Sequence, residues 1–219
     1  MSVRTGRESA AERVYRWLRE RILDGTLAGG RLLSEGEVAD AVQVSRTPVR
    51  EAFLQLAAEG MLELFPKRGA LVVSVTAAQL REVLVARMLI EPWASREAAA
   101  RADRAGIAQR LRRLTAKASR ALDRQDVRGF QDADRDFHEQ VLAASGNELL
   151  AGFYASLRDR QLRAGTLAVY NDPARAATIT AQHDAIVDAI ERGDGDAAAT
   201  AMAEHLNGTA LALGLAPLR

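Results

Sequence analysis

The chemistry that the sequence offers is concentrated in its only three histidines, His138, His183 and His205. His138 follows Asp134 by four residues, so a carboxylate and an imidazole share one helix face and could ligate the same ion. His183 and His205 are equally far from Asp194, which lies in a turn between two expected helices. If these helices pack antiparallel, the two imidazoles become neighbours. Spacing therefore gives two pairs of candidate metal ligands, Asp134 with His138 and His183 with His205.

Two plainer interpretations stay open for these residues. A histidine on a helix is more often an ordinary core or surface residue than a ligand, and Asp134 with His138 could form a simple salt bridge. The residues that flank the histidines are apolar, however, and an imidazole without a partner is costly inside a core. Nitrogen and oxygen ligands without thiolate suit Zn²⁺, Ni²⁺ or Mn²⁺, and the spacing does not distinguish between these ions.

A second group of candidate residues is basic and lies near the N-terminus. Arg46 and Arg50 are four residues apart and share one face of an expected helix, with Thr47 beside them. Arginine can pair with O6 and N7 of guanine, and threonine suits a phosphate or a thymine methyl. Lys67 and Arg68 lie at an expected hairpin tip, where they would meet phosphate or a minor groove. Two arginines alone more often make a solvated helix face, so the DNA-binding interpretation depends on the surrounding elements.

Hydrophobic periodicity and capping residues predict the elements that position these groups. We expect helices at about 9–25, after Ser34, at 46–60, from Thr76 onward, and at 106–124, 128–145, 148–168, 173–192 and 195–213. Ser34 with Glu37 and Thr76 with Gln79 have the spacing of capping boxes. Residues 62–75 are the only convincing β segment, two short strands joined by a basic turn.

Length and composition set the outer limits. The chain has 219 residues and a formal net charge of +1. It contains no cysteine, and this excludes a disulfide scaffold, a thiolate metal site and a cysteine nucleophile. The charge argues against coating nucleic acid by bulk charge. Neither a signal-like segment nor an apolar run of membrane-spanning length is evident, so we expect a cytoplasmic protein without a membrane partner. The fold class we expect is mainly α, with a winged helix-turn-helix domain at 1–76 and an all-α antiparallel helical bundle at 77–219.

The N-terminal part resembles the DNA-binding domain of the GntR family of bacterial transcription regulators. The resemblance rests on Ser-Arg-Thr-Pro-Val-Arg-Glu-Ala at 45–52 and on Leu-Arg-Glu-Arg-Ile-Leu-Asp-Gly-Thr-Leu at 18–27. It implies that a double-stranded DNA operator is the partner and that the contacts come from Arg46, Thr47, Arg50, Lys67, Arg68 and Gly69. The chain departs from the family at Gly36, where an arginine is common.

The C-terminal part resembles the FCD effector domain that defines the FadR-type branch of this family. The motif Asp134-x-x-Phe137-His138, with His183 and His205 on later helices, carries this resemblance. It implies that Asp134 and the three histidines hold a divalent ion and that a small carboxylate effector fills the open positions on that ion. Arg87 is the leading candidate for a further partner of the effector, followed by Asn147 and Arg163. A plain structural role stays open for each of these three.

Together the motifs predict a metabolite-responsive transcription regulator, of which repressors are the commonest kind, acting as a homodimer on a palindromic operator and not as an enzyme. One alternative is a metal-dependent enzyme that acts on a small organic acid. Against it, no further histidine remains as a general base, and a winged helix would have no role. Another alternative is a metal ion that serves only as a structural staple.

Overall fold

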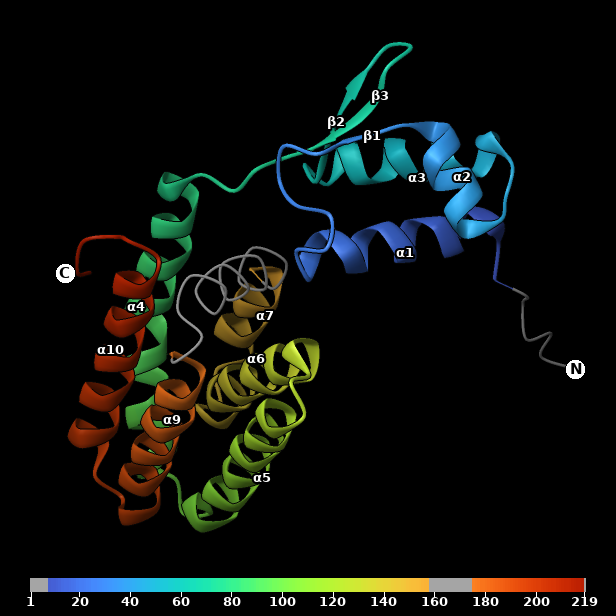
Figure 1. Cartoon of the computed structure of the whole chain (residues 1–219). Helices are drawn as coiled ribbons and strands as arrows, with labels where there is room; N and C mark the ends of the chain where they lie inside the picture. The colour runs from blue at the N-terminus through green and yellow to red at the C-terminus, as the bar shows by residue number, and fades with distance from the viewer. Residues whose placement is uncertain (1–7, 158–174, 219) are drawn as a thin grey trace, which may run out of the picture. The chain divides into compact units, whose positions relative to one another are not determined.

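The computed structural model describes residues 8–157 and 175–218 of the chain (Figure 1). The described residues are mainly α-helical, with one small sheet near the N-terminus, which confirms the predicted fold class. The chain divides into two compact units, Met1–Val75 and Thr76–Arg219. None of the helices within the described ranges is long and apolar enough to cross a membrane.

The first unit is a three-helix domain with a short sheet. Its elements are α1 (Ala10–Leu23), β1 (Leu32–Leu33), α2 (Glu35–Val42), α3 (Arg46–Ala58), β2 (Leu62–Phe65) and β3 (Gly69–Val72). Helix α1 packs against α3 because each carries an apolar stripe, with Leu18 on α1 and Val49 and Leu56 on α3 fully buried. This packing leaves the opposite face of α3 to solvent.

The capping prediction for α2 is half correct. The side chain of Ser34 accepts a hydrogen bond from the backbone N–H of Glu37, as expected of an N-cap residue. The carboxylate of Glu37 pairs instead with Arg31, at 2.5 Å, so it does not return to the backbone of Ser34. In contrast, Thr76 and Gln79 form the complete capping box at the start of the first bundle helix.

The sheet has one more strand than the sequence indicated. Its order is β1-β3-β2, with both pairs antiparallel, and Leu32 of β1 lies opposite Leu71 of β3. The expectation that all β structure lies within residues 62–75 was wrong, because a two-residue strand is too short to show an alternating pattern. The β2–β3 turn closes with a hydrogen bond from the N–H of Arg68 to the carbonyl of Phe65. Lys67, with a φ of 63°, projects at its tip.

The second unit is a bundle of helices. They are α4 (Ala77–Ala100), α5 (Arg104–Asp123), α6 (Val127–Ala144), α7 (Glu148–Ser156), α9 (Arg175–Arg192) and α10 (Gly195–Ala212). Helix α4 packs against α10, and α5 packs against α6 and α9. Buried side chains from five of these helices meet in one core, namely Leu84, Leu111, Phe137, Ile186 and Met202. Beyond residue 157, the helix expected at 148–168 lies outside the described residues.

Candidate metal centre and nucleic-acid interface

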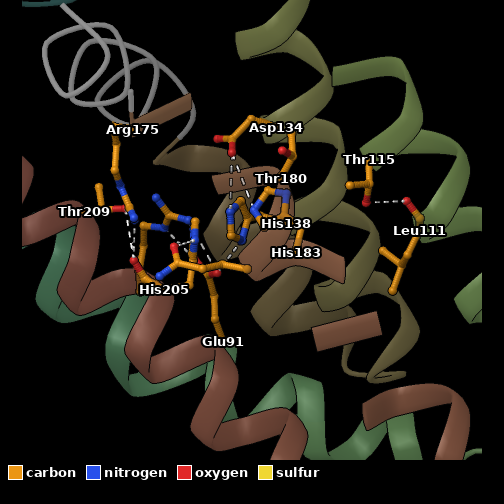
Figure 2. A network of polar contacts seen from close by, with 12 residues as sticks. Glu91, Leu111, Thr115, Asp134, His138, Arg175, Thr180, His183, His205 and Thr209 are labelled. Atoms are coloured by element: carbon orange, nitrogen blue, oxygen red, sulfur yellow. Dashed lines mark hydrogen bonds and ion pairs between the residues drawn. The ribbon is translucent and has the colours of Figure 1, made fainter. Parts of the chain in front are cut away.

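The three histidines meet inside the bundle, as Figure 2 shows. His138 lies on α6, His183 on α9 and His205 on α10, and none is more than 2% exposed. One ligand nitrogen from each ring lies within 4.8 Å of those of the other two. The ring centroids of His183 and His205 are 4.7 Å apart, so the turn at Asp194 does bring the two imidazoles side by side.

Asp134 faces the same point from one turn earlier on α6. Its Oδ1 lies 3.6 Å from Nε2 of His183 and 4.0 Å from Nε2 of His138. Protein nitrogen and oxygen ligands lie about 2.0–2.2 Å from zinc, so two ligands of one ion can be at most roughly 4.2 Å apart. The distances from Asp134 to His138 and to His183 fall within this limit, and the ligand nitrogens of the three histidines lie within 4.8 Å of one another, slightly above it.

Several polar atoms of this cluster are buried without a hydrogen bond from any described residue. They are Oδ1 of Asp134, both ring nitrogens of His138 and both ring nitrogens of His183. A buried polar atom without a partner is unfavourable by about 1–3 kcal/mol, so several at one point are rarely found without a bound group. The donor set of imidazole nitrogens and a carboxylate oxygen fits a divalent ion such as Zn²⁺, Ni²⁺ or Mn²⁺.

The electrostatics of the rings favour the form that binds metal. Burial lowers the pKa of His183 and of His205 well below the ordinary value of histidine, and nearby positive charge, including Arg87, acts in the same direction. Both rings are therefore neutral near neutral pH. Neutral imidazole has the free lone pair that a metal ion needs.

Arg87, the leading candidate for effector binding, is buried on α4 and engaged within the protein. Its Nε donates to Oε1 of Glu91 at 2.5 Å, one turn later on the same helix. The other carboxylate oxygen of Glu91 lies 2.6 Å from Nδ1 of His138. Burial alone would raise the pKa of Glu91, but the guanidinium of Arg87 outweighs it and holds that pKa at about 2. Contact of Arg87 with an effector stays a prediction.

The remaining effector candidates have different surroundings. Asn147 is the N-cap of α7, where its Oδ1 accepts from the N–H of Leu150 at 3.0 Å. This contact gives it a structural role that the sequence allowed. Arg163 lies outside the described residues.

Sequence reasoning missed several groups that surround the histidines. Tyr154 of α7 is 1% exposed, and burial raises the pKa of its hydroxyl, which lies within electrostatic reach of Glu91. Arg175 donates to the backbone carbonyl of His205 at 3.0 Å, and Oε1 of Gln182 lies 3.2 Å from Nδ1 of His205. Only the Arg87–Glu91 spacing of four residues left a signal in the sequence, as an ion pair on an otherwise apolar helix face.

The basic residues of the first unit surround a groove of about 750 Å³ between α3 and the β2–β3 hairpin. Arg46, Arg50, Lys67, Arg68 and Gly69 all line it, together with apolar side chains that include Leu54 and Phe65. Thr47 is exposed at the start of α3 but is not part of this lining. A helix N-terminus and a hairpin tip that present cations to one groove suit the phosphates and base edges of duplex DNA.

Arg50 is held by an acidic neighbour. Its Nε donates to both carboxylate oxygens of Glu35 at 2.8 Å. This hydrogen bond lowers the pKa of Glu35 and raises that of Arg50. Because the pair is at the surface, Arg50 can exchange this partner for a base edge at small cost.

Gly36 leaves space beside the other arginine. A Cβ at position 36 would lie 3.6 Å from Nη2 of Arg46, which is an ordinary contact distance. A long side chain there would share the space that Arg46 occupies.

Comparison with known proteins gives a consistent result for both units. Residues 10–72 match the family described as bacterial regulatory proteins of the gntR family, and residues 82–208 match the FCD domain. The transcriptional repressor RspR of Escherichia coli (strain K12) is 31% identical over 195 residues, which cover 89% of this chain and 85% of that protein. The gluconate operon transcriptional repressor of Bacillus subtilis (strain 168) is 29% identical over 150 residues, 68% of this chain and 61% of the relative.

A solved structure shows the same arrangement of elements. A transcriptional regulator GntR from Rhodococcus sp. RHA1 superposes with a TM-score of 0.73 at 25% identity, covering 93% of this chain and 97% of that one. These relatives regulate transcription, which confirms the prediction that the chain is not an enzyme. The chain belongs to the GntR family of DNA-binding transcription regulators, in the branch whose C-terminal part is an FCD domain.

Proposed function

We propose that the chain is a metabolite-responsive repressor that binds a palindromic operator as a homodimer and senses a small carboxylate at a divalent-metal site. The observation that carries the sensing part is the cluster of three buried histidines, His138, His183 and His205, with the carboxylate of Asp134 beside two of them. The DNA-binding part acts on the chromosome, so we place the protein in the cytoplasm. Repression is supported by the relatives from Escherichia coli and Bacillus subtilis, which are both repressors.

The DNA-binding part of the proposal uses the groove of the first unit. Arg46, Thr47 and Arg50 at the start of α3 would enter the major groove, while Lys67 and Arg68 at the hairpin tip would contact phosphates or the minor groove. A palindromic operator has two equal half-sites, which a two-fold symmetric dimer can contact in the same way.

The sensing part of the proposal uses the bundle. Asp134 and the three histidines would hold the ion, and a divalent ion supplies Lewis acidity that binds carboxylate oxygens. Arg87 would favour an anionic effector through its charge, from a position fixed by Glu91. The Bacillus subtilis relative is named for the operon of gluconate, itself a small carboxylate, which supports this class of effector.

Native mass spectrometry of the purified full-length chain tests the proposal directly. We expect a dimer that carries one divalent ion per subunit and an additional small acid. Operator DNA selected from a random pool should then be released when gluconate or acetate is added to the metal-loaded dimer. A monomer without metal would contradict the proposal, whereas a metal-loaded dimer that never responds to small acids would support a purely structural ion.

Replacement of Arg50 by alanine tests the base-reading role. We expect specific operator binding to weaken by about 1–3 kcal/mol and base preference to relax at one position, because a bidentate guanine contact is lost. Lys67→Ala should weaken binding to all sequences evenly and reduce the salt dependence. Titration of labelled operator and random DNA at several salt concentrations measures both effects.

The exposed Arg113 of α5 supplies the matched control, since Arg113→Ala removes the same charge from the bundle. It should leave DNA binding unchanged. Equal losses on operator and random DNA for Arg50→Ala would show that Arg50 contacts only the phosphate backbone.

A further inference from the structure

We propose that Glu91 is a positioning residue for the metal ligand His138, because its carboxylate decides which ring nitrogen carries the proton. The consequence is that Nε2 of His138 is left with a free lone pair facing Asp134 and His183. The inference rests on the proposed metal site and extends it to α4, a helix that supplies none of the four ligands.

The contact itself is short and fully enclosed. Oε2 of Glu91 lies 2.6 Å from Nδ1 of His138, and the two side chains are 0% and 1% exposed. The other oxygen of Glu91 pairs with the permanently charged guanidinium of Arg87, whose Nε donates to it at 2.5 Å. A carboxylate in this ion pair has only acceptor oxygens, and two lone pairs would repel each other at 2.6 Å, so the ring proton belongs on Nδ1. The neutral form of the ring, which is the form that binds a metal, has one N–H, so with the proton on Nδ1 its Nε2 is bare.

The second ring nitrogen faces the rest of the ligand set. Nε2 of His138 lies 4.0 Å from Oδ1 of Asp134 and makes no hydrogen bond with any described residue. If the proton were on Nε2, it would point at that carboxylate and no lone pair would face the site. The position of one proton therefore decides whether His138 presents a lone pair to the site without first changing its tautomer.

Glu91 is itself held in place from its other side. Nε of Arg87 donates to Oε1 of Glu91 at 2.5 Å, and both residues lie on successive turns of α4. This continuous arrangement of guanidinium, carboxylate and imidazole is the type of support that orients metal-bound histidines in proteins. It also gives Arg87 a defined task, which is to hold the carboxylate of Glu91 in place.

The corresponding contact at His205 differs in one decisive respect. Oε1 of Gln182 lies 3.2 Å from Nδ1 of His205, but an amide group can either donate or accept. Gln182 therefore tolerates both tautomers of His205, whereas Glu91 permits only one tautomer of His138. Among the described residues that contact the three rings, this makes Glu91 the group that imposes a tautomer from outside the ligand set.

The test is nitrogen-15 NMR of the histidine rings in the full-length chain, combined with Zn²⁺ titration. Because the chain has three histidines, the spectrum holds only three ring patterns, and a His138→Gln variant identifies one of them. In the metal-free wild type we expect His138 to be protonated at Nδ1. Glu91→Gln should lose this strict preference and bind Zn²⁺ about 10- to 100-fold more weakly.

A second variant guards against a simple folding defect, because Glu91→Gln leaves the buried Arg87 without its anion. The double variant Arg87→Met/Glu91→Leu removes both charges together, a change that buried ion pairs often tolerate. Asp134 is then the carboxylate left beside His138, so its proton should move to Nε2 and Zn²⁺ affinity should fall as in Glu91→Gln. Glu204→Gln, at an exposed position beside His205 in the sequence, is the matched control and should change neither readout.

The possible results distinguish failure of the proposed metal site from failure of the role proposed for Glu91. If the wild type does not bind Zn²⁺ through its histidines, the proposed metal site is wrong. If the wild type binds Zn²⁺ but both Glu91 variants keep the Nδ1–H tautomer and full affinity, the metal site stands and the role of Glu91 is overturned. A tautomer shift with the expected fold-loss supports the inference.

Discussion

A chain carrying His183→Ala is expected to lose its stabilisation by Zn²⁺ altogether. His183 is fully buried at the centre of the cluster, with Nε2 3.6 Å from Asp134 and its ring 4.7 Å from that of His205. An ion that binds only the folded chain stabilises it by about 2.7 kcal/mol at 100 times its Kd and about 4.1 kcal/mol at 1,000 times. Thermal unfolding with and without Zn²⁺, together with metal analysis after dialysis, measures the effect.

For each variant, the quantity to compare is the gain in stability against unfolding that Zn²⁺ produces, not the stability of the metal-free chain. The ring of His183 stacks on Phe137 with centroids 3.9 Å apart, so truncation also leaves a cavity that destabilises the metal-free chain. Asp184→Ala is the matched control, because it removes an exposed, potentially metal-binding neighbour outside the cluster. The Asp184→Ala chain should keep the full gain in stability on Zn²⁺ binding. A His183→Ala chain with complete metal content would remove His183 from the ligand set.

Gly69→Ala is expected to be the most damaging single change in the first unit. Gly69 begins β3 with a φ of 110°, and a Cβ there would lie 2.1 Å from the backbone oxygen of Leu33. Backbone strain and a clash with β1 add together, so we expect a loss of about 3 kcal/mol or more in the free energy of unfolding. Operator binding should fall with it, since the hairpin that carries Lys67 and Arg68 is displaced.

Gly60→Ala separates the two causes. Gly60 also has a positive φ, of 71°, but nothing lies within 4 Å of a Cβ at this position. Strain alone should cost about 1–2 kcal/mol there. Denaturant unfolding of both variants and of the wild type gives the difference that belongs to the close approach of β1 and β3. Equal losses in the two variants would argue against that contact, and a normally stable Gly69→Ala chain with weak DNA binding would favour direct DNA contact by Gly69.

The sequence predicted the elements whose signals are local. The apolar stripes of α1 and α3 and the capping box at Thr76 each depend on residues within a few positions of one another. Strand β1 has no such signal, because Leu32 and Leu33 pair with residues of β3 far along the chain. The same limit explains Glu37, whose spacing to Ser34 fits a capping box but whose carboxylate finds Arg31 instead.

At the candidate metal site, too, local spacing predicts some contacts and contacts between distant residues are missed. Spacing indicated that His183 and His205 are neighbours, because two helices joined by a short turn pack side by side. The contact between Glu91 and His138 depends on how α4 packs against α6, which no local pattern reveals. The pairing of Arg87 follows from this packing as well. The ligand candidates can therefore be predicted from the sequence, whereas the residues that contact and orient them are identified only from the folded structure.

The distribution of the three histidines over α6, α9 and α10 has a consequence for the whole bundle. An ion bound by all three rings would join segments that are distant along the chain, and would act as a reversible cross-link. Cross-links of this kind restrict the unfolded chain, as disulfides do, and their effect grows with the length of the loops that they close. The chain contains no cysteine, so coordination would give it a cross-link that does not depend on the redox state of its surroundings.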